Sequence, residues 1–387
     1  MKSIPYARQH ISQADVDAVV QVLQSDWLTQ GPAIERFEQA LASYCGAPHA
    51  SAVCNATAGL HLACLALGLG PGDLLWTSPN TFVASANCAL YCGAAVDFVD
   101  IDPDTWNMSA AALEAKLLRA QKEGRLPKIV MPVHFGGQPC DMRAIGALAE
   151  RFGFAVIEDA SHAIGASCEG VRIGACDRSD IAVFSFHPVK IMTTGEGGAL
   201  LTRRPDLDGR IKLLRSHGVT RDPALMDATP HGPWYYQQTG LGYNYRMTDL
   251  QAALGASQLA RIDAFLTRRR QLARNYDRLL GSLPLTLPRE RPGVQSSWHL
   301  YVVRIQGEPG RKARGQVIAE LHRAGIRANV HYIPVHTQPH YRKLGFRPGD
   351  FPQAERHYEE AISLPMYFDL SEADQAFVAA RLHDILS

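Results

Sequence analysis

The chain has 387 residues, of which 46% are hydrophobic and 20% charged, and its formal net charge is +1. This composition is typical of a globular protein and excludes a disordered chain, and the length predicts one large domain followed by a smaller one. The near-zero charge gives no global attraction to nucleic acid or to an anionic membrane, so neither is expected as a partner.

The N-terminal sequence MKSIPYARQH lacks the apolar run of a signal peptide, and no apolar run approaches the roughly 20 residues of a membrane helix. The eight cysteines form no CxxC pair and are interpreted as reduced, mostly buried thiols. A cytoplasmic location follows, with a disulfide framework as the weaker alternative.

The first predicted elements are two helices. ISQADVDAVVQVLQSDW fits a helix with Ser12 as its N-cap and an apolar stripe of Val16, Val19, Val20 and Leu23. The segment WLTQGP ends it, and AIERFEQALASYCG then predicts a second amphipathic helix.

The central part of the chain alternates between strands and helices. SAVCNATAGLHLACLALGLGPGD indicates a short strand, a turn at residues 55–57 and a helix. The short apolar runs that follow are AAVDFVDI, KIVMPVHF, FAVIEDAS, IAVFSF and GALLT, several of them separated by helical segments. This pattern predicts the α/β class, with a largely parallel sheet covered by helices on both faces.

The alternation weakens after about residue 205, and from roughly residue 250 long charged helices precede WHLYVVRI and GQVIAELHRAG. We therefore predict a large domain over residues 1–250 and a small α+β domain over residues 251–387. The N-terminal segment is counted with the large domain, with packing on the small domain as the alternative.

Three groups of polar residues follow or close predicted strands. Asp159 follows FAVIE, Ser185 and Lys190 close or follow IAVFSF, and Asn55 and Thr57 follow SAVC at the start of a helix. In an open α/β sheet, ligands bind beyond the carboxyl ends of the strands, and a helix N-terminus suits a phosphate.

A carboxylate, a lysine and a phosphate site at one sheet edge are what pyridoxal phosphate requires. The lysine amine binds the aldehyde, the carboxylate keeps the ring nitrogen protonated, and Phe82 is a candidate to stack on the ring. Each feature alone also has a structural explanation: a surface lysine, a helix cap at Asp159, a turn residue at Thr57 or a core aromatic at Phe82.

The motifs EDASHAIGA and SFHPVKIMTTGEGGAL, in this order, resemble the DegT/StrS family of sugar aminotransferases. The likeness extends over nearly the whole chain, through NATAGLHLACLALGLGPGD, TSPNTFVASANCALYCGA and GYNYRMTDLQAALG. It implies a fold type I aminotransferase that uses pyridoxal 5′-phosphate and works as a homodimer with shared active sites.

The resemblance also implies roles for single residues. Lys190 matches the lysine that holds the cofactor, Asp159 the partner of the ring nitrogen and His162 a residue near the ring and its 3′ oxygen. The other matches are to phosphate ligands at Thr57, Ala58 and Ser185, to the stacking position at Phe82, and to an asparagine that reaches a neighbouring subunit's phosphate at Asn244. One branch of the family has histidine in place of the lysine and carries out dehydration, so Lys190 favours transamination.

The substrates implied are L-glutamate as amino donor and a UDP-linked 4-keto-6-deoxy-N-acetyl hexose as acceptor. SFHPVK and ANVHYIPVHTQPHY look most like the transaminases of pseudaminic acid biosynthesis that make UDP-4-amino-4,6-dideoxy-N-acetyl-β-L-altrosamine. Another 4-keto or 3-keto nucleotide sugar and a non-catalytic regulatory relative are the alternatives. The segments expected to contact the substrate contain Tyr6, Asp26, Trp27, Leu28, Thr29, Asn329, Val330, His331 and Tyr332.

A metal site is the remaining alternative, because His331, His336 and His340 are spaced in a loosely zinc-like pattern. Two prolines interrupt any helix there, and the stretch contains no cysteine or carboxylate. We therefore expect no metal.

Overall fold

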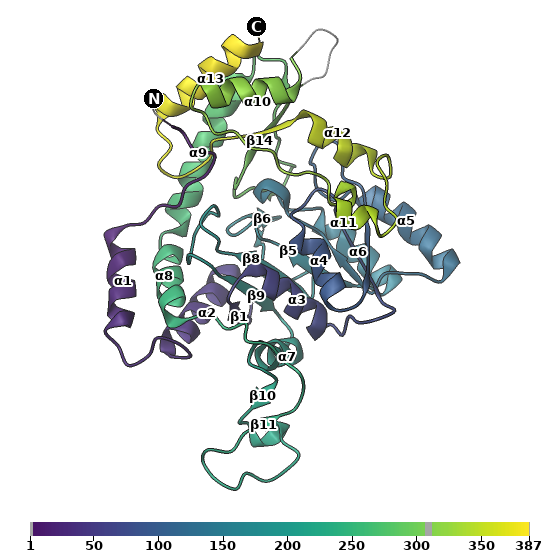
Figure 1. Cartoon of the computed structure of the whole chain (residues 1–387), viewed down its shortest axis with the longest axis vertical. Helices are drawn as coiled ribbons and strands as arrows, with labels where there is room; N and C mark the ends of the chain where they lie inside the picture. The colour runs from purple at the N-terminus through teal and green to yellow at the C-terminus, as the bar shows by residue number, and fades with distance from the viewer. Residues whose placement is uncertain (1–2, 306–311, 387) are drawn as a thin grey trace.

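The computed structural model describes residues 3–305 and 312–386, which are built around a seven-stranded sheet (Figure 1). The strand order is β1-β9-β8-β5-β4-β2-β3. All neighbouring pairs are parallel except those of β9, which runs antiparallel to both β1 and β8. The seven strands are β1 (His49–Val53), β2 (Leu74–Thr77), β3 (Ala95–Phe98), β4 (Ile129–Met131), β5 (Ala155–Asp159), β8 (Ile181–Ser185) and β9 (Gly198–Thr202).

Helices cover both faces of this sheet, which explains why its central strands are almost continuously apolar. On β8, Val183 packs with one layer of helices, whereas Ala182 and Phe184 pack with the other. The first layer consists of α3 (Ala56–Ala66), α4 (Ala84–Tyr91) and α7 (Pro205–Arg215). The second consists of α2 (Pro32–Cys45), α5 (Ala110–Glu123), α6 (Met142–Phe152) and α8 (Asp249–Leu259). The predicted α/β architecture is confirmed.

Helix α1 (Gln13–Leu23) begins after Ser12 as predicted, and most of its apolar stripe faces outward. Val16, Val20 and Leu23 are exposed. Asp15 is buried instead and accepts hydrogen bonds from the side chains of α8. The face of α1 that packs on the body therefore contains both Asp15 and the buried Val22, whereas Val16, Val20 and Leu23 face outward.

The C-terminal part of the chain forms a separate core around a three-stranded sheet of order β12-β14-β15. Its strands are β12 (Leu285–Thr286), β14 (Tyr301–Ile305) and β15 (Ala361–Leu364), and its helices are α9 (Ile262–Leu280), α10 (Arg314–Arg323) and α13 (Glu372–Leu386). Ile4 joins this core and bridges Ile326, so the N-terminal segment lies here. The division of the chain at residue 250 stays a prediction.

The remaining elements are short. They are β6 (Ser167–Cys168), β7 (Val171–Arg172) and β13 (Val294–Gln295), which form one small sheet, together with α11 (Pro339–Arg342), α12 (Pro352–Glu360) and the 3-10 turns η1 (Phe135–Gly137), η2 (Pro223–Leu225) and η3 (Val335–Thr337). Within residues 3–305 and 312–386, no helix combines the length and the apolar character of a transmembrane span.

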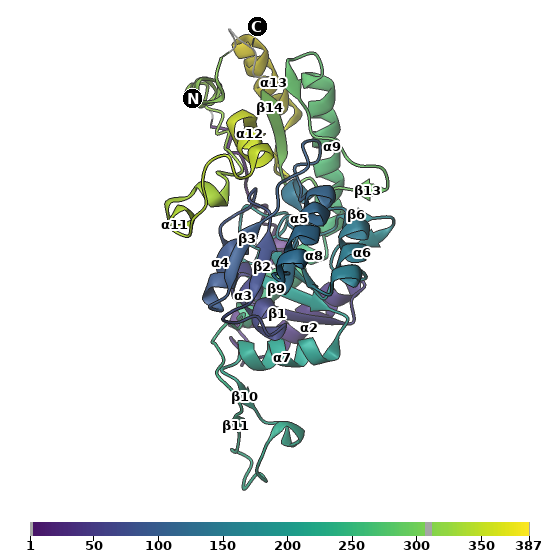
Figure 2. The ribbon, with the colours of Figure 1, turned by 90° about the vertical axis from the view of Figure 1, so that its right-hand side faces the viewer.

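An arm formed by residues 216–244 projects from the body next to α7 (Figures 1 and 2). Its only regular structure within these residues, apart from η2, is the two-stranded pair β10 (Val219–Thr220) and β11 (Gln237–Gln238). Trp234 is 67% exposed and Leu241 79% exposed, and Leu225 and Tyr236 are exposed as well. Large apolar side chains on a projecting arm are typical of a surface that another protein chain covers.

Candidate active site

The candidate site forms where the carboxyl ends of β1, β5 and β8 meet, because these three strands run in the same direction. Val53 at the end of β1 and Ser185 at the end of β8 both pair with Gly198 of β9. Asp159 at the end of β5 pairs with Val183 of β8. The sheet register alone therefore brings the start of α3, Ser185 and Asp159 to one edge.

The N-terminus of α3 supplies an anion site at this edge. Asn55 caps the helix by accepting a hydrogen bond of 2.8 Å from the amide of Ala58, and the other first-turn amides have no partner within the helix. A Cβ atom on Gly198 would lie 2.7 Å from the amide nitrogen of Ala56, so only glycine lets α3 start this close to the sheet. The hydroxyls of Thr57 and Ser185 line the same cavity.

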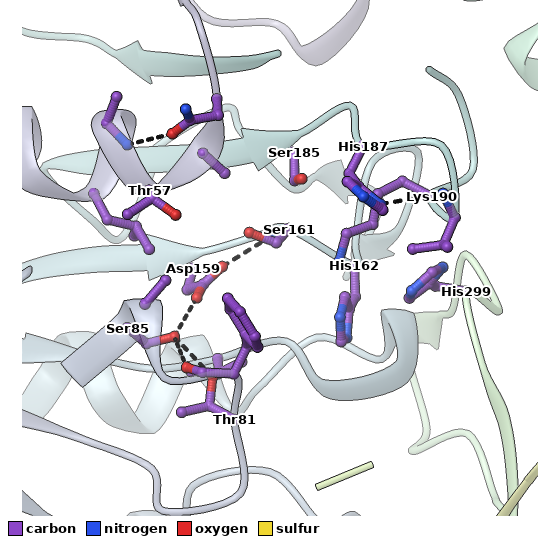
Figure 3. Close-up of a pocket in the computed structure, with 18 of the residues that line it drawn as sticks. Thr57, Thr81, Ser85, Asp159, Ser161, His162, Ser185, His187, Lys190 and His299 are labelled. Carbon is purple, nitrogen blue, oxygen red and sulfur yellow. Dashed lines mark hydrogen bonds between the residues drawn. The ribbon is translucent and has the colours of Figure 1, made fainter. Parts of the chain in front are cut away.

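These groups open into a cavity of about 840 Å³ at the sheet edge (Figure 3). Eleven of the residues predicted from the sequence line it: Tyr6, Asn55, Thr57, Ala58, Phe82, Asp159, His162, Ser185, Lys190, His331 and Tyr332. Phe82 is 60% exposed and lies on the cavity wall, so the interpretation of Phe82 as a core residue is wrong.

The Asp159 carboxylate is fixed by hydrogen bonds to both of its oxygens. The Ser85 hydroxyl donates to Oδ2 at 2.6 Å, and the amide of Ser161 donates to Oδ1 at 3.1 Å (Figure 3). Thr81 contacts the Ser85 oxygen at 2.7 Å and is the donor there, since Ser85 gives its own hydrogen to Asp159. The carboxylate is thus held in one orientation at the cavity wall.

Lys190 follows β8 in a tight turn, in which its amide donates to the carbonyl of His187 at 2.8 Å. Part of its side chain faces the cavity, and the loss of water around the amine lowers the pKa of Lys190 to about 8, against the opposing influence of Asp159. Within the described residues, no hydrogen bond to this amine is present. An easily deprotonated amine that makes no hydrogen bond within the described residues is suited to bond covalently to an aldehyde.

Three neutral imidazole rings form the part of the cavity wall near Lys190. Burial, assisted by the charge of Lys190, lowers the pKa of His162 and His299 well below the ordinary value and that of His331 to about 3. The rings of His162 and His299 lie 4.4 Å apart (Figure 3). This wall offers hydrogen-bond donors and acceptors without charge.

Several residues of the site were not predicted from the sequence: Thr81, Ser85, Ser161, Tyr245 and His299. The only sequence signal for Ser85 and Ser161 is their proximity to Phe82 and Asp159. His299 lies 109 positions after Lys190 in a segment with no recognisable motif, and only the folded chain brings it to the cavity.

Seven predicted residues do not line this cavity: Asp26, Trp27, Leu28, Thr29, Asn244, Asn329 and Val330. Trp27, Leu28 and Asn244 are exposed. The segment around Leu28 and Thr29 lies beside the start of α8, where Thr29 bridges Thr248, and Asn244 bridges Ser216 at the base of the arm.

The histidines of HYIPVHTQPHY face different partners. His331 Nδ1 pairs with the Ser363 hydroxyl at 2.7 Å, whereas His336 Nε2 pairs with Glu355 at 2.9 Å. His340 is exposed. The three histidines therefore lie in different surroundings: His331 lines the cavity, His336 is buried against Glu355, and His340 lies on the surface.

Known proteins resemble this chain along its whole length. The profile of the DegT/DnrJ/EryC1/StrS aminotransferase family matches residues 9–383. The spore coat polysaccharide biosynthesis protein SpsC of Bacillus subtilis is 39% identical over 386 residues, which cover 99% of this chain and 97% of SpsC.

Two solved structures illustrate the likeness of the fold. PseC of Helicobacter pylori, described as an aminotransferase involved in the biosynthesis of pseudoaminic acid, matches with a TM-score of 0.90 and 29% identity over 100% of this chain and 99% of its own. The PMP form of the sugar aminotransferase Spr1654 of Streptococcus pneumoniae matches with a TM-score of 0.89 and 29% identity over 99% of this chain and 98% of its own.

Proposed function

The chain belongs to the DegT/DnrJ/EryC1/StrS aminotransferase family and is a pyridoxal-phosphate-dependent sugar aminotransferase of fold type I, and from this premise we propose its substrates and the roles of its residues. The proposed reaction moves the amine of L-glutamate to C4 of a UDP-linked 4-keto-6-deoxy-N-acetyl hexose, giving UDP-4-amino-4,6-dideoxy-N-acetyl-β-L-altrosamine. The observation that carries it is the single cavity that holds Lys190, Asp159 and the N-terminus of α3.

The cavity fits pyridoxal phosphate at three points. The α3 N-terminus with Thr57, Ala58 and Ser185 would hold the phosphate, Asp159 the ring nitrogen, and Lys190 the aldehyde carbon. When bound, the cofactor supplies a carbon that binds amines and a ring that accepts the electron pair left when a proton departs from the substrate. Phe82 is assigned to stack on the ring from the exposed side of the cavity.

The chain's own residues provide the charge and the proton transfer. Asp159, held by Ser85, presents a negative charge that keeps the ring nitrogen protonated. Lys190 Nζ is assigned to remove the proton from one carbon of the donor and to deliver one to C4 of the sugar, since a pKa of about 8 leaves part of it neutral near pH 7. Delivery from one side only would set the configuration of the new amine.

The neutral wall supports a sugar as the acceptor. His162, His299 and His331 carry no charge at neutral pH, and each ring nitrogen either donates or accepts a hydrogen bond. Hydroxyl groups match such a wall better than a carboxylate does, because a hydroxyl both donates and accepts hydrogen bonds whereas a carboxylate only accepts them.

The charges in the cavity support a homodimer with shared sites. Lys190 is the only lysine or arginine among the described residues that line it, although the phosphate and the nucleotide diphosphate together carry several negative charges. Asn244 and the exposed Trp27 lie outside the chain's own cavity. We assign them to the cavity of a second copy, with the apolar side chains of the arm and of α1 covered in the dimer.

The pseudaminic acid branch is supported by SFHPVK and by the likeness to PseC. The 39% identity to SpsC favours a second candidate, an aminotransferase for another 4-keto or a 3-keto nucleotide sugar of a surface polysaccharide. Both candidates share the site and differ in the configuration of the sugar.

The test separates these candidates by half-reactions. The enzyme is loaded with amine from glutamate, freed of the donor, and offered the L-arabino and D-xylo 4-keto epimers separately while the visible absorbance is followed. If the visible absorbance that glutamate removed returns with the L-arabino epimer, the result supports the altrosamine product. A response to the D-xylo epimer alone would rule out the altrosamine product and still support amination at C4. If neither epimer responds and a 3-keto sugar nucleotide does, both the product and the amination at C4 are ruled out.

A further inference from the structure

Tyr332 and His162 share a hydrogen bond of 3.0 Å between Tyr332 Oη and His162 Nε2, and both side chains line the cavity. The direction of this bond follows from the other ring nitrogen. The amide of Gly136 donates to His162 Nδ1 at 3.2 Å, so Nδ1 carries no proton. Burial lowers the pKa of His162 well below its ordinary value, so the ring is neutral and its one proton lies on Nε2. His162 therefore donates and Tyr332 accepts.

This direction leaves the hydrogen of the Tyr332 hydroxyl free. A tyrosine hydroxyl accepts and donates, and its accepting side is filled by His162. Within residues 3–305 and 312–386, no acceptor for the Tyr332 hydrogen is present. Burial raises the pKa of Tyr332, so this hydrogen stays on the oxygen at neutral pH. Hydroxyls inside proteins normally have a partner, and here only the contents of the cavity can provide it.

The tyrosine is also held in place. Its backbone amide donates to the Asn80 side chain at 3.2 Å. Its ring lies against the edge of Phe135, with 6.2 Å between the ring centroids, and is nearly parallel to His162. The donor thus has a fixed position before any ligand binds, which is the condition for strong stabilisation of charge.

We infer that the Tyr332 hydroxyl donates a hydrogen bond to an electron-rich oxygen of the ligand in the cavity, and that His162 is the positioning residue that directs it there. The inference rests on the proposed function, because it takes the ligands to be the cofactor and a keto sugar. Two oxygens have the required chemistry: the carbonyl oxygen of the sugar, which gains negative charge as nitrogen attacks the carbon, and the ring oxygen of the cofactor.

The experiment compares Tyr332→Phe with wild type in three measurements: the glutamate half-reaction, the half-reaction with the 4-keto sugar nucleotide, and the pH titration of the visible absorbance without substrate. A contact to the sugar carbonyl should slow only the sugar half-reaction, by about 10- to 100-fold. A contact to the ring oxygen should shift the midpoint of the absorbance titration in the absence of sugar.

Tyr276→Phe is the matched control. It also removes a buried tyrosine hydroxyl, whose hydrogen bond of 3.0 Å goes to the carbonyl of Pro365, but Tyr276 belongs to the core around α9 and not to the cavity wall. It should lower the melting temperature without changing either half-reaction by more than about twofold. The same kinetic losses in both variants would mean that Tyr332 acts through the fold, which overturns the inference.

The role of His162 is tested by coupling. In a His162→Asn background, Tyr332→Phe should cost much less than it does in wild type, because the direction of the hydroxyl is already lost. Full additivity of the two changes overturns the positioning role. If Tyr332→Phe folds poorly, His162→Asn alone tests the same pair, because it removes the group that directs the hydroxyl.

Failure of the inference and failure of the proposed function look different. Wild-type rates in Tyr332→Phe, together with an unchanged absorbance titration, overturn the inference and leave the aminotransferase intact. A wild-type protein that glutamate does not bleach, or that no keto sugar restores, overturns the proposed reaction instead.

Discussion

The Ser85 hydroxyl donates a hydrogen bond of 2.6 Å to the Asp159 carboxylate, although 74 positions separate the two residues. The bond joins the start of α4 to the end of β5 at the cavity wall. Asp159 therefore does not hold its orientation alone, and its value as the partner of a ring nitrogen depends on a serine from another segment.

Replacing Ser85 by alanine should weaken the binding of pyridoxal phosphate about tenfold, because a hydrogen bond to a charged group is lost and Asp159 gains freedom to rotate. The measurement is a titration of the apoenzyme followed by cofactor absorbance. Ser109→Ala is the control, since it removes a serine hydrogen bond at the start of α5, away from the cavity. Equal affinity in Ser85→Ala and wild type would remove Ser85 from the site.

The pH dependence of cofactor capture tests the environment of Lys190. Burial lowers the pKa of Lys190 from its ordinary value of 10.5 to about 8, so the amine is neutral and reactive above pH 8 and protonated below it. The rate at which the apoenzyme develops visible absorbance with pyridoxal phosphate should rise with pH and level off with a midpoint near 8. A midpoint near that of a free alkyl amine would show that the amine is not desolvated.

The sequence predicted the elements that the sheet edge depends on, because strand ends, a helix cap and a glycine-rich turn are local signals. Asn55, Asp159, Ser185 and Lys190 lie at such ends and meet in the structure. The motif resemblance supplied the expected role of each residue, which spacing alone leaves open.

What the sequence did not predict depends on contacts between distant segments. Strand β2, with sequence LLWT, is too short to be recognised from its pattern, yet the loop that follows it contains Thr81 and leads to Ser85. His299 reaches the cavity only through the packing of the C-terminal part. The periodicity of α1 identified its apolar stripe. It could not tell which surface covers that stripe, and in the structure Val16 and Val20 face outward.

Covalent attachment of the cofactor gives a direct test of Lys190. Reduction of the holoenzyme with borohydride should fix the cofactor to the peptide that contains Lys190, as seen by mass spectrometry, because Lys190 is the only lysine among the described residues that line the cavity. Lys190→Ala should still bind the cofactor weakly through the phosphate site and show no turnover. Recovery of the label on another lysine, or full activity in Lys190→Ala, would contradict the assignment.

Subunit complementation tests whether the sites are shared. Asn244 is exposed and lies outside the cavity of its own chain, so we expect it to serve the phosphate site of a second copy. Lys190→Ala and Asn244→Ala homodimers should then both be impaired. In a heterodimer of the two, one cavity combines an intact Lys190 with an intact Asn244 of the partner, whereas the other cavity lacks both.

Since about half of randomly assembled dimers are heterodimers with one intact site each, the mixture should recover about a quarter of wild-type activity. Differently tagged chains, purified in sequence, give the heterodimer alone and raise this to about half. A pure heterodimer that works no better than its two parents would mean that Asn244 does not act across the interface, and the exposed asparagine would then need another explanation.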